Sequence, residues 1–249
     1  MNNEIFQHFH GYELLLKKID NLVFNYQNYG RNAVSDFYNP DALEVIKRYL
    51  SDSCDYHFFG GYMQSVRKVL IIGNKTNDSE VLTCLEAKFN QRFNVLDNRD
   101  IKGAVYNLGI DIGKIGDYWV ENEKIFLYCH NEIADYLIDN FKQIGKCNVD
   151  FRKVEFHTQT FKFDNFNVTV NSTRLDSIVG AIIRKSREKS KERINAGLVN
   201  VNFRQIEQCD YLCKAEDILS IKKVGRYRIK DIQKNIKSGK IILSIDKYI

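Results

Sequence analysis

The segment 173–202 constrains the fold of this chain more than any other, because it joins a helix that needs a core to a helix that offers mainly charge. In its first part, apolar residues recur at positions i, i+3, i+4 and i+7, the spacing of one buried helical stripe. In its second part, residues 184–193, six residues are basic and two are acidic, and the first aliphatic anchor is Ile194. The buried stripe consists of Leu175, Ile178, Val179 and Ile182.

The two expected helices are antiparallel or steeply crossed, because Lys185 and Ser186 leave room only for a short turn. Ser186 is a typical N-cap of the second helix. Gly197 is the expected end of that helix, since glycine adopts a positive φ at little steric cost. A strand is expected over residues 198–201, and Asn202 is a turn residue.

These residues resemble the S4-like RNA-binding domain, named after a protein of the small ribosomal subunit. The likeness covers most of residues 171–249, with one departure: Phe203 stands where such domains often have glycine, so the turn type there is open. Motifs farther upstream run in the order of the YlmH family of bacterial RNA-binding proteins, which the whole chain resembles. The motifs are Arg174-Leu175-Asp176, Ser186-Arg187, Ile194, Gly197, residues 199–202, 215–221 and 225–227, and upstream residues 58–62, Arg67-Lys68, 99–104, 108–110 and 114–117.

The resemblance implies a protein that binds structured RNA without catalysing a reaction on it. Proteins of this family associate with the large ribosomal subunit and with transfer RNA during the rescue of stalled nascent chains, and they are linked to cell division. We therefore expect large-subunit ribosomal RNA and transfer RNA as partners. Lysine and arginine neutralise phosphates, while serine hydroxyls and N–H groups at a helix start add shorter-range hydrogen bonds. The expected RNA-binding residues are Arg174, Lys185, Ser186, Arg187, Lys189, Ser190, Lys191, Asn202 and Arg226.

Positive charge is concentrated in the last third of the chain. Residues 171–249 contain 18 lysines and arginines and nine acidic residues, a net charge of +9, whereas residues 1–170 contain 19 and 23, a net charge of −4. Such asymmetry is typical of a polyanion partner. A membrane surface would attract the same charge, but residues 184–193 have no apolar face to insert into it. Nucleic acid is therefore the favoured partner.

Length and composition are typical of a cytoplasmic globular protein. The 249 residues, 44% of them hydrophobic, are enough for conventional cores. We expect no secretory signal and no membrane span, since no apolar run is long enough for either. Six scattered cysteines suit reduced thiols, and Cys209 and Cys213 lack the spacing and the second ligand pair of a zinc site. We expect a monomer without a metal or a cofactor.

The pattern of apolar residues predicts a mixed α/β (α+β) chain with three domains. The first is an α/β domain of helices and strands, and the second has the order β-α-β-β-α-β that is typical of ferredoxin-like folds and of RNA-recognition motifs. The third is the S4-like domain, which a connector with a short edge strand at residues 168–170 precedes. The domains are expected at residues 1–76, 77–160 and 168–249.

The expected elements of the first two domains follow from apolar spacing and from turn residues. In the first domain we expect helices over residues 12–26 and from Pro40, where proline suits the first helical position, and strands over Tyr56–Phe59 and Val69–Ile72. In the middle domain we expect strands and helices, in order, at residues 81–89, 100–108, 118–120, 124–129, 132–144 and 147–154.

Two aromatic residues, Phe126 and Tyr128, share one face of the third strand of the middle domain. Recognition motifs stack bases on rings in this position, but the strand lacks the glycine-and-aromatic signature of those motifs. Packing inside the protein explains the two rings at least as well, so both interpretations stay open.

An RNA-modifying enzyme is the main alternative function. Arg174-Leu175-Asp176 resembles the catalytic motif of RNA pseudouridine synthases, in which the aspartate attacks the ribosyl base. Here the motif opens a helix, and Asp176 follows Thr173 at the spacing of a capping box, so we expect Asp176 to be a helix cap. A protein-interaction module, with the acidic first 170 residues recruiting a division partner, is a further alternative.

Overall fold

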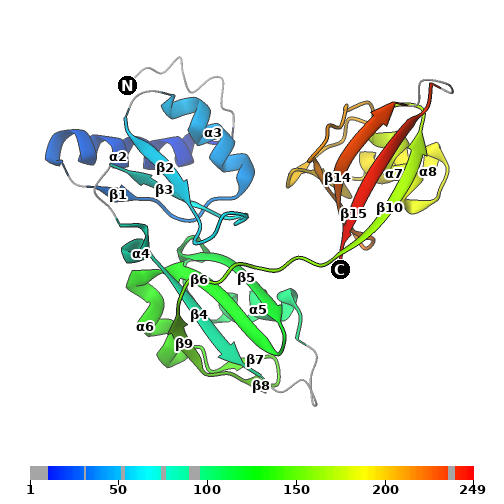
Figure 1. Cartoon of the computed structure of the whole chain (residues 1–249). Coiled ribbons are helices and arrows are strands. Elements are labelled where there is room, and N and C mark those ends of the chain that lie inside the picture. Colours follow the sequence, from blue (N-terminus) through cyan, green and yellow to red (C-terminus); the bar gives the residue numbers. More distant parts are fainter. Residues whose placement is uncertain (1–10, 31, 52–53, 74–76, 90–95, 235–238) are drawn as a thin grey trace. The chain divides into compact units, whose positions relative to one another are not determined.

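The computed structural model describes residues 11–249, except residues 31, 52–53, 74–76, 90–95 and 235–238 (Figure 1). The chain forms two compact units, Met1–Gln159 and Thr160–Ile249. Each unit combines helices with antiparallel sheets, so the predicted mixed α/β class is confirmed. The first unit contains both of the first two expected domains, and the boundary between them at residue 76 stays a prediction.

The N-terminal part of the first unit is a three-stranded antiparallel sheet packed against two helices. The strands β1 (Ala33–Val34), β3 (Val69–Ile72) and β2 (Tyr56–Phe59) lie in that order, so β3 is central. The helices are α2 (Glu13–Tyr29) and α3 (Pro40–Leu50), and α3 begins with the proline that the sequence placed there. Their shared core consists of Ile19, Ile46, Leu50, Leu70 and Ile72.

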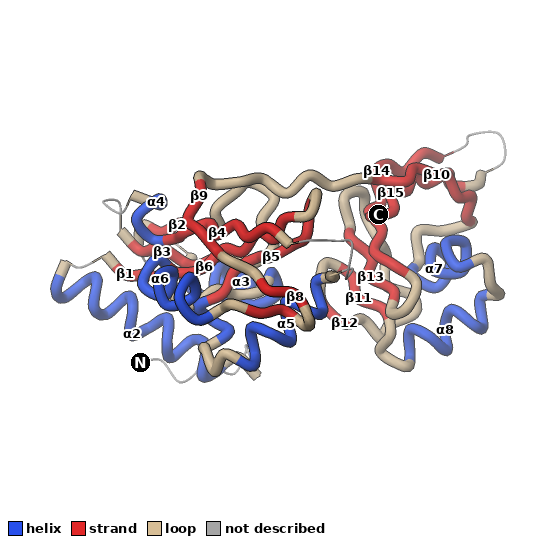
Figure 2. The backbone as a smooth tube through the Cα atoms, turned by 90° about the horizontal axis from the view of Figure 1, so that it is seen from below, coloured by secondary structure: helices blue, strands red, loops and turns tan. Residues whose placement is uncertain are grey.

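The middle part of the first unit has the predicted ferredoxin-like topology. Its four-stranded antiparallel sheet has the order β5-β6-β4-β9, with helices α5 and α6 packed on one face (Figure 2). The chain therefore visits the strands in the order β-α-β-β-α-β, as the sequence indicated. The elements are α4 (Asp78–Val81), β4 (Leu82–Lys88), α5 (Asn98–Asn107), a 3-10 turn (Ile112–Lys114), β5 (Ile115–Glu121), β6 (Lys124–His130), α6 (Asn131–Asn140) and β9 (Phe151–Val154).

The helix expected over residues 132–144 ends early, at Asn140. A small hairpin follows it, formed by β7 (Gln143–Ile144) and β8 (Cys147–Asn148) around Gly145, whose φ is +57°. Phe141 and Ile144 are buried and continue the apolar spacing of the helix, so periodicity could not separate a longer helix from a buried hairpin.

Strand β6 is buried on both faces, which decides the open question about its aromatic rings. Phe126 is 4% exposed and Tyr128 is 0% exposed. Both belong to an apolar cluster that β6 shares with the N-terminal part of the unit, and the His157 ring stacks on Phe126 with 4.1 Å between centroids. These rings are core residues and offer no platform to a base. Their partners in the cluster include Phe37, Tyr62, Val69, Ile71 and Trp119.

A partly buried carboxylate, that of Asp117 in β5, joins the N-terminal segment to the middle sheet. Its oxygens accept hydrogen bonds from the backbone N–H groups of Val66 (2.6 Å) and Arg67 (3.0 Å) and from the hydroxyl of Tyr62 (2.9 Å). The guanidinium of Arg67 donates in turn to the carbonyl oxygen of Phe37 (3.0 Å). Because unpaired backbone groups are costly inside a protein, this carboxylate stabilises the junction.

The second unit is a six-stranded antiparallel sheet with the order β10-β15-β14-β13-β11-β12, and two helices cover one of its faces (Figure 2). β10 is an edge strand, as expected, but it begins at Phe163 rather than at residue 168. Alternate residues of the strands form the core with the helices, so the residues between them, among them Asn165 and Arg226, lie on the opposite face. The elements are β10 (Phe163–Val170), α7 (Leu175–Ile183), α8 (Arg187–Asn195), β11 (Val199–Val201), β12 (Arg204–Gln205), β13 (Ile218–Ile221), β14 (Gly225–Lys234) and β15 (Ile241–Tyr248).

Replacing Asp117 with alanine is expected to lower the free energy of unfolding of the first unit by roughly 3 kcal/mol, because three partly buried donors lose their acceptor. Tyr62→Phe removes one of these donors only and is expected to cost about 1 kcal/mol. Urea unfolding of the two variants and the parent protein measures both values. If both variants lost the same free energy of unfolding, the conclusion that the carboxylate holds all three donors would be contradicted.

Candidate nucleic-acid interface

Helices α7 and α8 meet at a tight turn, as the sequence predicted. Arg184 ends α7 in the left-handed conformation, with φ +53°, and the N–H of Lys185 donates to the carbonyl oxygen of Gly180 (3.1 Å). Ser186 is the N-cap of α8, since its hydroxyl oxygen accepts a hydrogen bond from the N–H of Lys189 (3.4 Å). The predicted N-cap is therefore confirmed.

The carboxylate of Asp176 lies between the two helices and is fully buried. It accepts hydrogen bonds from the guanidinium of Arg174 (3.2 and 3.3 Å) and from Nε of Arg187 (2.9 Å). Arg174 immediately precedes α7, and Arg187 is the first residue of α8. One buried acid therefore holds two arginines from separate segments at the same place.

The prediction that Asp176 caps α7 is wrong. The N-cap residue is Arg174, and it makes no side-chain capping bond. The carboxylate is engaged by two guanidinium groups instead, and such charge-assisted hydrogen bonds are stronger than a bond to a backbone N–H. Burial by itself raises the pKa of Asp176, but the hydrogen bonds and charges of Arg174 and Arg187 outweigh it and hold that pKa below its usual value.

The prediction that Ser190 contacts phosphate is also wrong, because Ser190 is fully buried. Its hydroxyl donates to the carbonyl oxygen of Ser186 (3.0 Å). The side chain fills the contact between the helices, where a Cβ atom on Gly180 would come within 2.9 Å of the Ser190 oxygen. Ser190 and Ile194 are four residues apart and form the buried side of α8, a pattern that the surrounding charges concealed.

The buried side of α8 leaves its basic residues on two flanks. Arg187 and Lys191, four positions apart, share one flank, and Lys189 and Arg193 share the other. On the second flank, Lys189 pairs with an acidic neighbour in the helix (3.1 Å), and Arg193 donates to the carbonyl oxygen of Lys222 (2.9 Å). On the first flank, Arg187 also contacts Asp176, and Lys191 has no acidic partner among the described residues.

Several basic residues around the turn are exposed or partly exposed. The side chain of Arg187 is 57% exposed and that of Arg174 is 34% exposed, although both contact Asp176. Lys185 and Lys191 are exposed. Together with the capping serine they are called the basic surface below, which consists of Arg174, Lys185, Ser186, Arg187 and Lys191.

The remaining predicted RNA-binding residues, Asn202 and Arg226, lie elsewhere in the second unit. The amide of Asn202 donates to Asp217 (2.8 Å) and accepts from the N–H of Ile218 (2.9 Å), so it supports the turn after β11. Arg226, in β14, is exposed on the open face of the sheet, 5.3 Å from the ring of Phe203. The nine predicted residues therefore divide into the five of the basic surface, Lys189 on the other flank of α8, the structural residues Ser190 and Asn202, and Arg226 on the sheet.

The cysteines show no sign of special chemistry. All six thiols are free. Burial raises the pKa of Cys213 to about 12, so this thiol stays protonated and unreactive. Within the described residues, no group of three histidine, cysteine or acidic side chains is arranged to hold a metal ion. None of the helices in the part of the chain that the structure describes is long and apolar enough to cross a membrane.

Asp176→Asn is expected to lower the free energy of unfolding by about 2 kcal/mol near neutral pH, because the arginines lose a charged acceptor. A depressed carboxyl pKa gives stabilisation that is present above the ordinary value of 3.8 and is lost as the pH falls through the folded-state pKa. The difference between parent and variant should therefore shrink below about pH 4. Thermal unfolding across this range tests it, and a difference independent of pH would contradict it.

Comparisons with known proteins relate the chain to YlmH. Residues 75–158 match the family described as "Putative RNA-binding domain in YlmH". A relative from Bacillus subtilis (strain 168), ribosome-associated protein quality control protein P2, is 28% identical over 220 residues, which cover 84% of this chain and 85% of the relative. The structure of the cell division protein YlmH from Streptococcus pneumoniae matches with a TM-score of 0.51 at 19% identity, covering 59% of this chain and 93% of that one, and shows a shared fold. The resemblance seen in the sequence is thus confirmed: residues 75–158 match the putative RNA-binding domain in YlmH, and most of the chain is similar to a ribosome-associated quality control protein.

Proposed function

We propose that this protein binds structured RNA without altering it chemically, and that the basic surface of the α7–α8 pair is its main RNA contact. The observation that carries this proposal is the position of Asp176, which holds Arg174 and Arg187 beside each other at the start of their helices. Side chains that are already ordered lose less conformational entropy when they bind. The pair is therefore prepared for phosphate before RNA arrives.

The negative charge of Asp176 offsets part of the positive charge of Arg174 and Arg187. Two neighbouring lysines supply further positive charge. Lys185 and Lys191 are exposed and have no acidic partner among the described residues. The N-terminus of α8 lies at the same turn, and helix N-termini favour anions through their N–H groups. Contacts of this kind recognise the shape of a folded RNA backbone rather than its sequence.

The targets follow from the relatives rather than from the geometry. Because a relative is named for ribosome-associated quality control, we propose large-subunit ribosomal RNA and transfer RNA as ligands. On the same ground we place the protein in the cytoplasm, acting as a monomer at the ribosome. Residues 168–249 would be an S4-like domain in this scheme. The name of the Streptococcus pneumoniae structure supports a link to cell division.

The middle sheet is a less suitable RNA contact than a recognition motif of the same topology. The aromatic face of β6 is filled by Phe37, Tyr62 and Trp119 of the same unit. Any contribution of residues 75–158 to RNA binding therefore uses another surface. This supports the proposal of a main contact in the second unit, where the positive charge is concentrated.

The burial of Asp176 weighs against the alternative of a pseudouridine synthase. A nucleophilic aspartate must reach the target nucleotide, but the Asp176 side chain is 0% exposed and forms ion pairs with two arginines. Its surroundings are those of a structural ion pair.

Lys185→Ala combined with Lys191→Ala is expected to flatten the slope of log affinity for transfer RNA against log salt concentration by about one to two units, following counterion release for two lost phosphate contacts. Filter binding over a range of salt concentrations, repeated with purified large ribosomal subunits, measures the slope.

The matched control is Lys17→Ala combined with Lys47→Ala, which removes two exposed helical lysines from the first unit. The total charge changes equally in both double variants. A slope that falls by the same amount in the control would show that net charge, and not the basic surface, determines the affinity.

Deletion of the protein is expected to leave every modification of ribosomal and transfer RNA in place, because the candidate nucleophile Asp176 is buried. Mass analysis of RNA from cells with and without the protein tests this expectation. A missing pseudouridine, restored by the parent protein, would favour the modifying enzyme instead.

A further inference from the structure

A row of arginine and aromatic side chains crosses the open face of the second sheet, opposite the face that α7 and α8 cover. Strand registers place the members on one face: Tyr248 lies opposite Phe163, and the strand positions of Arg226 and Arg228 alternate with that of buried Tyr227. This set is called the arginine–aromatic row below, and its members are Phe203, Arg226, Tyr248, Arg228 and Phe163.

The row runs in the order Phe203, Arg226, Tyr248, Phe163, Arg228, so each arginine contacts at least one ring. The guanidinium carbon of Arg226 lies 5.3 Å from the ring centroid of Phe203 and 5.9 Å from that of Tyr248. Arg228 lies 4.9 Å from the ring of Phe163, and the rings of Phe163 and Tyr248 are 5.0 Å apart. Cation–π contacts of this kind hold a planar guanidinium flat while leaving its N–H groups available.

The two arginines of the row differ in their partners. Arg228 donates to the buried carboxylate of Asp246 and lies 3.7 Å from a carboxylate oxygen of Glu216. Arg226 has no acidic partner within the described residues and is exposed. The row therefore contains one guanidinium that is balanced within the protein and one whose charge is open to an anion.

Phe203 occupies a backbone position that is unfavourable for it. Asn202 and Phe203 form the two-residue turn between β11 and β12, with φ values of +49° and +69°. Glycine or asparagine is preferred at such positions, and a bulky residue there is uncommon. The Phe203 ring is outside the apolar core of the unit, so core packing does not account for it. Strain of this kind concentrates at binding sites.

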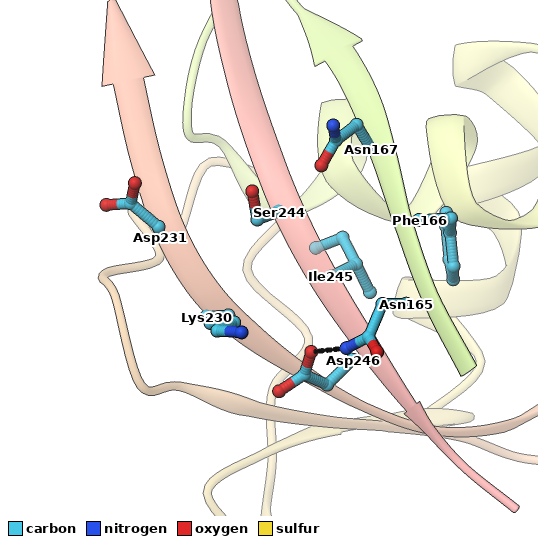
Figure 3. A pocket seen from close by; sticks show the side chains of 8 residues that line it. All are labelled: Asn165, Phe166, Asn167, Lys230, Asp231, Ser244, Ile245 and Asp246. Carbon is cyan, nitrogen blue, oxygen red and sulfur yellow. Dashed lines mark hydrogen bonds between the residues drawn. The ribbon is translucent and has the colours of Figure 1, made fainter. Parts of the chain in front are cut away.

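A polar pocket of about 320 Å³ adjoins the row on the same face (Figure 3). Two of its lining side chains, Asn165 and Asn167, come from β10, and Ser244 comes from β15. Asp246 lines the pocket and connects it to the row. Its carboxylate accepts hydrogen bonds from Asn165, which also lines the pocket, and from Arg228, which belongs to the row. Amides and hydroxyls can donate to and accept from the edges of a base.

We propose that the arginine–aromatic row binds unpaired nucleotides of RNA, with bases stacked on Phe203 and Tyr248 and a phosphate held by Arg226. This rests on the proposed function and adds a contact of a different kind on the other face of the same sheet. Aromatic rings beside an arginine suit single-stranded RNA, since every base presents a flat face. An acidic peptide would use the charge of Arg226 but not the flat rings.

Phe203→Gly tests the proposal in the full chain, because it removes the ring and relieves the strained turn together, so the fold is not weakened. The probe is an RNA of about ten nucleotides without self-complementarity, a length within the range of single-strand sites. Affinity is expected to fall about tenfold with an unchanged salt slope, since stacking neutralises no phosphate. Arg226→Lys should also weaken binding, because lysine keeps the positive charge but lacks the planar guanidinium group that stacks on rings.

The double variant Lys185→Ala, Lys191→Ala separates this proposal from the function on which it rests. It should weaken transfer RNA binding strongly and single-strand binding little, whereas Phe203→Gly should do the reverse. Unchanged single-strand affinity in Phe203→Gly overturns the row as a binding site and leaves the basic surface standing. Tighter binding of a glutamate-rich peptide than of RNA, lost in Phe203→Gly, would assign the row to a protein partner and also overturn the proposal.

Discussion

The helix pair of the second unit depends on a single carboxylate that water does not reach. Asp176 binds Arg174 and Arg187, which lie on either side of α7, and this arrangement fixes where both arginines stand. A buried acid without such partners would be strongly unfavourable, so the two guanidiniums are required by the fold as well as available to a ligand. Beside it, the contact between Gly180 and Ser190 lets the two helices approach closely enough for one acid to serve both.

The sheets of the two units are covered to different extents, and this difference underlies the RNA contacts that we propose. In the first unit, β6 is buried on both faces. Hydrogen bonds to Asp117 hold the N-terminal segment against the sheet face that carries Phe126 and Tyr128. In the second unit only one face of the sheet is covered. Its helices carry the basic surface, and its open face carries the arginine–aromatic row, so one small unit presents two chemically distinct surfaces. Residues 75–158, which match the putative RNA-binding domain in YlmH, thus have the topology of an RNA-recognition motif, but the sheet face on which such motifs stack bases is covered.

Most of the fold could be predicted from the spacing of apolar residues, because helices and strands impose different periods on the chain. Strands β2 and β3, the start of α3 at Pro40 and the N-cap Ser186 followed from local pattern alone. The end of α6 could not be predicted in this way, because a buried Ile144 is compatible with a longer helix and with a hairpin. The two helices of the candidate site and the turn between them were also predicted. Ser190 was misassigned because its neighbours are charged, although Ile194 four residues later indicated a buried face.

The sequence by itself determined the order of elements, the separation of charge and the place of the two helices, because these depend on residues close together in the chain. Tertiary structure alone decided which side chains face water. Phe126 and Tyr128 became core when residues far upstream covered them, and Asp176 became the partner of two arginines when α8 folded back on α7. Phe203, Arg226 and Tyr248 meet only because distant strands pair side by side. Burial and long-range contact depend on the packing of remote segments, and local spacing carries no record of it.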